Sequence, residues 1–317
     1  MKIYYSAQYN FDLGMASKLA DWYRFDYAKF RHTKELLADL SAIEYVAPAQ
    51  ALSLDVLQEP MMLQGRAKSR SKTWITRALG LPNLPFLSLS WLDQHFLLPM
   101  RWACAATLQA ASAALQGESA WNTSGGYHHA SSTSCEGFCI YNDISTAVFS
   151  LRADGKLSEN DRILIIDVDA CHGNGIAYDF FEDERVTILD LYNDGIYPID
   201  RYSKKRIDIA LPLPSGSEGP AYLSLLESGL AQLRARIAAH GAFKLAFVIA
   251  GANVLASDRY ARLALEVQDC AERDWRIHAM LKQAQIPAVF LGGGGYGPEA
   301  AQAQAASIRR LLTPAAH

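Results

Sequence analysis

Four short runs of apolar residues recur in the second half of the chain. They span residues 162–169, 186–191, 244–250 and 287–291, and each run ends in polar or glycine residues. Their apolarity is continuous rather than alternating, which is typical of strands that are buried on both faces. The pattern therefore predicts a parallel sheet that is covered by helices on both sides.

Helical periodicity separates and precedes these runs. An Ala-rich helical pattern covers residues 98–115, and a second long helix fits residues 220–240. Residues 60–90 are irregular and rich in basic residues, Ser, Pro and Gly, so we expect a surface loop region with short helices there. Together these patterns predict an α/β fold.

The length and composition favour one compact unit. The chain has 317 residues, of which 50% are hydrophobic and 20% are charged, so it can bury a large core. No internal repeat, low-complexity linker or abrupt change of composition divides it. We therefore expect a single α/β domain over residues 1–317.

Charge and cysteine content limit the classes of partner. The formal net charge is -3 and the pI is about 6.2, which gives no basic field for nucleic acid. No stretch approaches the roughly 20 apolar residues of a membrane span. The five cysteines are scattered without CxxC pairs, as expected for reduced thiols. We expect a cytoplasmic protein without a direct nucleic acid partner.

Unusual polar residues follow the predicted strands. Loops beyond the carboxyl ends of parallel strands converge at one edge of the sheet, where α/β proteins collect their functional groups. The polar and glycine residues at the ends of the four runs or beyond them are Asp167, Asp169, Asp190, Asn253, Asp258 and residues 292–296. The sequence thus predicts a functional site at this edge.

Two adjacent histidines lie in a glycine-flanked loop. His128 and His129 follow Gly125 and Gly126, which permit the irregular backbone that a shared role of neighbouring imidazoles requires. Two imidazoles together could divide base and acid duties near neutral pH. A solvated histidine loop is the alternative, and this motif alone leaves both open.

A second motif, DVDACHGNG at residues 167–175, follows a buried strand. Alternation at a strand end sends Asp167, Asp169 and Cys171 towards one side, and carboxylates and thiolates are competent zinc ligands. Asp258, beyond another strand, could supply a third ligand. Capping of the following helix by the aspartates is the structural alternative, and it stays open on this segment alone.

Four glycines and a tyrosine end the last apolar run. The glycines at residues 292–295 could let the backbone approach a ligand, and the Tyr296 phenol could donate a hydrogen bond to a developing oxyanion. A flexible turn with a packing aromatic residue is the other reading. The spacing fits no phosphate-binding loop.

Taken in order, these motifs resemble the histone deacetylase superfamily, which has the arginase/deacetylase fold. The resemblance rests on GGYHHASS, GFCIYND, DVDACHGNG, YNDGIYP, a strand-end Asp and GGGGY, and it is densest between residues 125 and 200. It implies a single-domain parallel sheet of about eight strands, and the motifs look most like class IV enzymes and their bacterial relatives.

The resemblance also implies a role for each matching residue. His128, His129, Asp167 and Tyr296 match the catalytic set, with His129 as the general base and Tyr296 polarising the scissile carbonyl. The residues that match the lining of the acyl-lysine channel are Gly137 and Phe138. The implied metal ligands are Asp169, Cys171 and Asp258. The implied cofactors are one catalytic Zn²⁺ and a structural K⁺ near Asp167 and Asp190.

Three positions depart from the family pattern. Cys171 stands where the family has a His metal ligand, and Asn253 stands where it usually has Asp. A thiolate together with two carboxylates would neutralise Zn²⁺ and make its bound water less acidic. The third departure, at residues 23–26, replaces the usual His-Pro-Phe-Asp. We expect it and Asn253 to affect the surroundings of the site rather than the chemistry.

The sequence thus predicts a zinc-dependent amidohydrolase, a metal-dependent deacylase. Its partners would be acylated lysine peptides or acylated small amines, with acetyl or longer fatty acyl groups removed. One alternative is an acyl-lysine-binding protein that has lost turnover through Cys171. Another is a hydrolase of small molecules of the acylpolyamine type.

Overall fold

Eight parallel strands form one sheet in the computed structural model, which describes residues 1–11, 28–41, 43–85 and 87–312. The strand order is β2-β1-β3-β8-β7-β4-β5-β6. The strands are β1 (Lys2–Tyr4), β2 (Tyr45–Val46), β3 (Ala120–Asn122), β4 (Ile163–Asp167), β5 (Val186–Asn193), β6 (Ile209–Leu213), β7 (Leu245–Ile249) and β8 (Ala288–Leu291). The predicted parallel sheet of about eight strands is therefore confirmed. The departure at residues 23–26 lies outside the described residues.

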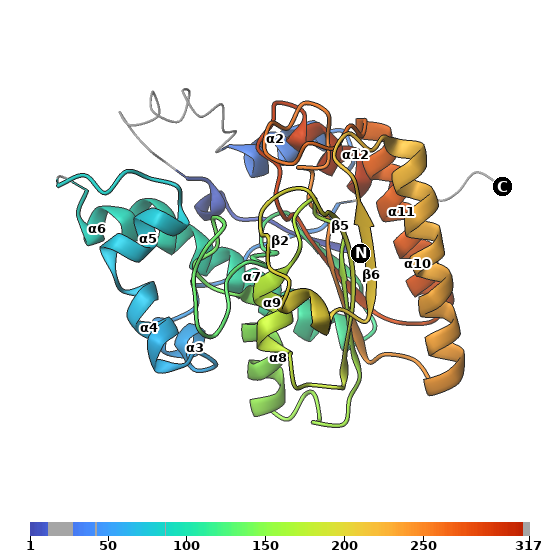
Figure 1. Cartoon of the computed structure of the whole chain (residues 1–317), viewed down its shortest axis with the longest axis horizontal. Coiled ribbons are helices and arrows are strands. Elements are labelled where there is room, and N and C mark those ends of the chain that lie inside the picture. Colours follow the sequence, from blue (N-terminus) through green and yellow to red (C-terminus); the bar gives the residue numbers. More distant parts are fainter. Residues whose placement is uncertain (12–27, 42, 86, 313–317) are drawn as a thin grey trace.

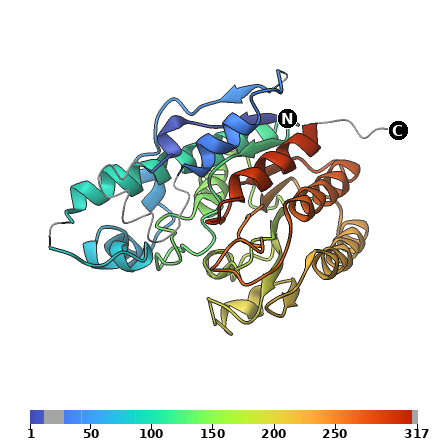
Figure 2. The ribbon, with the colours of Figure 1, turned by 90° about the horizontal axis from the view of Figure 1, so that it is seen from above.

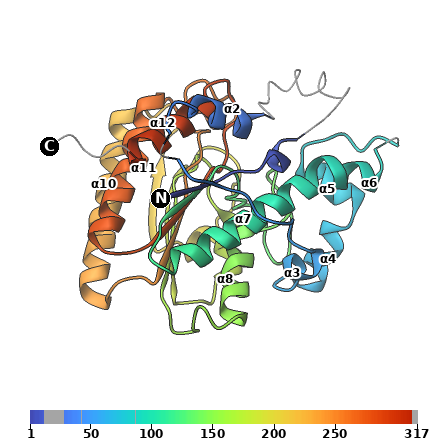
Figure 3. The ribbon, with the colours of Figure 1, turned by 180° about the vertical axis from the view of Figure 1, so that it is seen from behind.

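Helices cover both faces of this sheet. One group, at the right of Figure 1, consists of α10 (Gly219–His240), α11 (Val267–Gln283) and α12 (Ala300–Leu312), and α2 (Lys29–Leu36) packs beside α12. The other face carries α7 (Leu98–Ala114) and α8 (Asp143–Ala153), which are seen well from behind in Figure 3. The two long helices predicted at residues 98–115 and 220–240 are thus confirmed.

The continuous apolarity of the strands has a direct structural cause. In β4, Leu164 and Ile166 belong to the hydrophobic cluster beneath α10 and α11, whereas Ile163 and Ile165 belong to the cluster beneath α7 and α8. All four side chains are fully buried. Because successive side chains of a strand point to opposite faces, a sheet with two covered faces requires apolar residues at every position.

Short helices form a separate lobe at one end of the molecule, as Figure 2 shows. They are α3 (Leu54–Gln58), α4 (Leu63–Ser69), α5 (Lys72–Ala78) and α6 (Leu89–Leu92). The expectation of short helices in residues 60–90 is confirmed. The region nevertheless contributes to an apolar cluster, in which Leu57 and Ile75 are grouped with Met100 and Cys104 of α7.

The remaining regular segments are short. They are η1 (Ala7–Tyr9), η3 (Asp93–Leu97), α9 (Asn174–Asp179) and η4 (Ser203–Arg206). Within the described ranges, no helix is both long and apolar enough to cross a membrane.

Candidate functional site at the carboxyl ends of the strands

Four neighbouring strands bring the predicted site residues together. β3, β8, β7 and β4 are adjacent in the sheet, and all four run in the same direction. Their carboxyl ends therefore meet at one edge. The loop after β3 carries the histidine pair, and the loop after β8 carries the glycine run and Tyr296. β4 ends at Asp167 and is followed by Asp169, and the loop after β7 carries Asn253 and Asp258.

The two imidazoles are buried and each is held by a separate partner. His128 Nδ1 lies 2.7 Å from Asp167 Oδ2, and His129 Nδ1 lies 2.7 Å from Asn174 Oδ1. Asn174 Nδ2 donates to Glu136 Oε1, so the Asn174 oxygen faces His129 and accepts its Nδ1 proton. The ring centroids are 4.1 Å apart. The two histidines are therefore buried and fixed by hydrogen bonds, so the loop is not a solvated histidine loop.

The surroundings separate the charge states of the two rings. Burial alone would lower the pKa of His128, but the adjacent Asp167 and Asp169 carboxylates raise this pKa to about 9. Burial, and then the positive charge of His128, lowers the pKa of His129 to about 3. At neutral pH His128 is thus a cation paired with Asp167, and His129 is neutral.

Asp169 is enclosed by hydrogen-bond donors. Its Oδ1 accepts from the Cys171 N–H at 3.1 Å and from Asn253 Nδ2 at 2.6 Å, and its Oδ2 accepts from the Gly294 N–H at 2.8 Å. His128 Nε2 lies 3.8 Å from Oδ1. The side chain is almost fully buried. Three N–H groups and a nearby imidazolium therefore surround this carboxylate.

The Asp258 carboxylate accepts two backbone N–H groups. Its Oδ1 accepts from the Tyr260 N–H at 2.9 Å, and its Oδ2 accepts from the Tyr296 N–H at 2.8 Å. The carboxylate thus fixes the loop that carries Tyr296. In the part of the chain that the structure describes, no group of three or more His, Cys, Asp or Glu side chains could hold a metal ion. The structure does not gather Asp169, Cys171 and Asp258 into such a group.

Cys171 is partly buried among carboxylates. Burial, followed by the negative charges of Asp169, Asp167 and Asp258, raises the pKa of its thiol well above the usual range. The thiol is therefore protonated in the metal-free chain, and a metal ion that bound it would have to displace this proton.

Asn253 is the residue whose role the sequence reading missed. We expected it to affect only the surroundings of the site, yet its amide contacts Asp169 directly. One signal was available in the sequence, because Asn253 is four residues beyond the end of β7, whereas Asp258 is nine. A side chain so close to the strand end is better placed to reach the neighbouring strand-end loop.

A second imidazole–carboxylate pair lies next to the first. His172 Nδ1 is 2.6 Å from Asp190 Oδ2, and His172 Nε2 is 2.8 Å from Ser203 Oγ. All three residues are buried. His172, which sequence reasoning treated only as the neighbour of Cys171, therefore connects the loop after β4 to β5 and η4.

Three aromatic side chains lie close to one another near the imidazole pair. Phe138 and Tyr296 are partly exposed and their ring centroids are 5.2 Å apart, and Tyr260 lies 5.3 Å from Tyr296. Gly137 lies against His129, since a Cβ added at Gly137 would be 2.3 Å from His129 Cδ2. The predicted channel residues Gly137 and Phe138 are thus brought together with His129 and Tyr296.

A buried arginine supports two of the site loops from below. Arg273 Nη1 donates to the Val168 and Gly251 carbonyls at 3.1 and 2.7 Å, and its Nε lies 2.8 Å from Asp274 Oδ1. Arg273 and Asp274 are each 1% exposed. Val168 precedes Asp169, and Gly251 precedes Asn253 by two residues. The Arg273–Asp274 ion pair therefore holds the loop after β4 and the loop after β7, which meet at Asp169.

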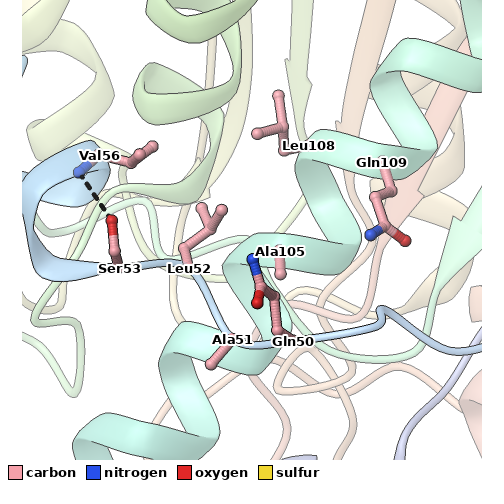
Figure 4. A pocket seen from close by; sticks show the side chains of 8 residues that line it. All are labelled: Gln50, Ala51, Leu52, Ser53, Val56, Ala105, Leu108 and Gln109. Atoms are coloured by element: carbon pink, nitrogen blue, oxygen red, sulfur yellow. Dashed lines mark hydrogen bonds between the residues drawn. The ribbon is translucent and has the colours of Figure 1, made fainter.

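A hollow of about 310 Å³ lies elsewhere, between residues 50–56 and α7 (Figure 4). Its lining includes Gln50, Ser53 and Gln109 but no charged side chain. Ser53 Oγ accepts from the Val56 N–H and so caps α3. The hollow therefore lacks the acids and bases that the strand-end site contains.

Solved structures define the class of fold. The crystal structure of the HDA15 HD domain superposes with a TM-score of 0.70 at 15% identity, and the match covers 98% of this chain and 90% of that chain. Acetylpolyamine aminohydrolase from Burkholderia pseudomallei gives 0.72 at 18% identity and covers 98% and 97%. The protein therefore has the arginase/deacetylase fold.

Sequence comparison narrows the class to a family. The histone deacetylase domain model matches residues 32–312. Histone deacetylase 2 of Arabidopsis thaliana is 31% identical over 316 residues, which are 98% of this chain and 78% of that protein. The chain belongs to the histone deacetylase family.

Proposed function

We propose that this chain binds acylated primary amines, such as an acylated lysine side chain or an acylated small amine, without hydrolysing them. The observation that carries the proposal is that partly exposed Phe138, which contacts Tyr296, follows Gly137, and that Gly137 packs against buried His129. Aromatic walls suit the apolar acyl and alkyl groups, and the imidazolium and phenol groups are donors for the amide carbonyl.

The expected catalytic zinc does not fit the donors that are present. A catalytic zinc site needs three protein ligands and one open position. The described residues include no group of three or more His, Cys, Asp or Glu side chains that could hold a metal ion, and an amide N–H of Asn253 rather than a further ligand faces Asp169. Recognition without turnover is therefore the function that the geometry supports best.

Amide hydrolysis is the second candidate, in the zinc-dependent form that the sequence predicts. It is favoured by the separate partners of the two imidazoles, Asp167 for His128 and Asn174 for His129. His129 could accept the proton of an attacking water, and His128 could donate a proton to the departing amine. Tyr296 could donate to the oxyanion. The same pocket would then select the substrate.

Binding and turnover can be measured on the same peptides. We expect acetyl-, octanoyl- or myristoyl-lysine peptides, or N-acetylputrescine, to bind at least about tenfold more tightly than the unmodified amine, which is about 1.4 kcal/mol. Calorimetry or fluorescence anisotropy would measure binding, and mass spectrometry would measure acyl release. We expect release at the background rate, with or without added zinc.

Variants separate the two candidates. Phe138→Leu should weaken binding about tenfold because an aromatic wall is lost, whereas Phe149→Leu, at a partly exposed position on α8, should not. Acyl release that a chelator and His129→Ala both abolish would establish hydrolysis instead. Equal affinity for acylated and unmodified amines would refute the proposed recognition.

We further propose that a monovalent cation such as K⁺ is held near Asp167 and Asp190. Asp190 Oδ1 is buried and has no hydrogen-bond partner among the residues described. A bound cation would neutralise this carboxylate oxygen. We expect a higher melting temperature in potassium chloride than in N-methylglucamine chloride at equal ionic strength, and Asp190→Asn should remove the difference. An identical melting temperature of the unmodified chain in both salts would contradict this.

A further inference from the structure

We propose that the Asn253 side chain takes the place of a metal ion at Asp169, so that a neutral hydrogen bond now stabilises a carboxylate that a cation would otherwise hold. The inference concerns the same pocket as the proposed function and rests on it for the kind of ligand that enters. It adds a cause for the lack of turnover and a way to reverse it. Its central observation is the contact of 2.6 Å between Asn253 Nδ2 and Asp169 Oδ1.

The hydrogen-bond network fixes which end of the Asn253 amide faces Asp169. The Ala170 N–H donates to Asn253 Oδ1 at 3.2 Å, and only an oxygen can accept it. The Nδ2 group must therefore point towards the Asp169 carboxylate. A metal ion would need the oxygen there instead, and turning the amide would place Nδ2 against the Ala170 N–H.

The space around Asp169 is also taken. A Cβ at Gly251 would lie 2.2 Å from Asp169 Oδ2, and a Cβ at Gly294 would lie 2.7 Å from the same atom. These glycines let two backbone segments close on the carboxylate, and the Gly294 N–H donates to it. Asp169 is thus closely packed, and both of its carboxylate oxygens accept hydrogen bonds from the chain.

In this arrangement the stability of the metal-free site depends on the Asn253 side-chain amide. Asn253→Asp would replace the Nδ2 donor with an oxygen and place two buried carboxylates at hydrogen-bonding distance. Such a pair is unfavourable unless a cation bridges it. Cys171→His would add a neutral imidazole, which is a common zinc ligand. The double variant Cys171→His/Asn253→Asp would therefore have two carboxylates and one imidazole, at positions 169, 253 and 171, as possible ligands of one zinc ion.

The test compares the unmodified chain, Asn253→Asp, the double variant Cys171→His/Asn253→Asp, and the control Asn193→Asp. Asn193 is another buried asparagine at a strand end, where it donates to Ser215 and the Ala261 carbonyl rather than to a carboxylate. Each protein is dialysed against zinc, freed of excess metal and analysed for zinc per chain. Melting temperatures are then recorded with zinc and with a chelator.

We expect the unmodified chain and Asn193→Asp to retain less than about 0.1 zinc per chain, and the double variant to retain about one. Asn253→Asp should melt at least about 5 °C below the unmodified chain with a chelator and recover with zinc. Zinc should not rescue Asn193→Asp. The melting curves keep the test decisive if the double variant is poorly produced.

Two results would overturn the inference. One is about one tightly bound zinc per unmodified chain that Asp169→Asn removes. The other is a folded Asn253→Asp protein whose stability does not respond to zinc. Failure of the unmodified chain to bind acylated amines would refute the proposed function but leave these metal measurements unchanged, so the two failures are distinguishable.

Discussion

Replacement of Arg273 by methionine is expected to lower the free energy of unfolding by about 3 to 5 kcal/mol, because it leaves the buried Asp274 carboxylate without its partner. The change also removes the donor to the Val168 and Gly251 carbonyls. Urea denaturation followed by circular dichroism would measure the loss. We expect the site loops to be affected with the core, since both carbonyls belong to residues beside Asp169 and Asn253.

The control for this prediction is Arg276→Met on the same helix. Arg276 forms an ion pair with Glu272 at 2.7 Å, but its side chain is 32% exposed. Exposed pairs contribute about 0 to 1 kcal/mol, so the expected loss is small. Equal losses in the two variants would show that burial of the Arg273 pair does not determine its contribution. A double variant, Arg273→Met/Asp274→Leu, should regain part of the stability because no charge is left unpaired.

Gly137→Ala is expected to abolish binding of acylated amines, with a loss of affinity of at least about 100-fold, or roughly 2.7 kcal/mol. Gly137 has φ +57°, and the added Cβ would lie 2.3 Å from the His129 ring. The imidazole must move, which opens its hydrogen bond to Asn174 and displaces it from its place beside Gly137 and Phe138. Anisotropy measurements with the acyl-lysine peptides would record the effect.

Gly155→Ala is the matched control. Gly155 has a similar φ of +68°, but an added Cβ meets nothing within 4 Å. Both variants therefore carry the backbone strain of a left-handed alanine, about 1 to 2 kcal/mol, and only one of them meets an imidazole. If both variants bound the peptides as the unmodified chain does, His129 would not limit the channel at Gly137.

The sequence predicted the inner strands β4, β5, β7 and β8 well because each of them contains a largely continuous apolar run. The pattern failed for the other half of the sheet for physical reasons. β1 and β3 have three residues each, which is too short for a periodicity to be visible. β6 is an edge strand whose side chains alternate between buried and exposed, and its Pro212 weakens the strand signal.

The sequence motifs predicted which aromatic and imidazole side chains of the candidate site lie close together. His128, His129, Phe138 and Tyr296 are found together, as the resemblance implies. Residue charge alone did not predict that Asn253, rather than Asp258, contacts Asp169. Asp258 is satisfied by backbone N–H groups of its own loop and of the Tyr296 loop, and such contacts leave no mark in the residue types.

The place of β8 in the sheet affects how the protein is made. β8 is the last strand within the described ranges, yet it lies between β3 and β7 near the middle of the sheet. Until it leaves the ribosome, β3 and β7 each have an unpaired apolar edge, which is a hazard for aggregation. A premature stop before Ala288 would thus leave two open half-sheets, and we expect the cell to lose the whole protein rather than its final segment.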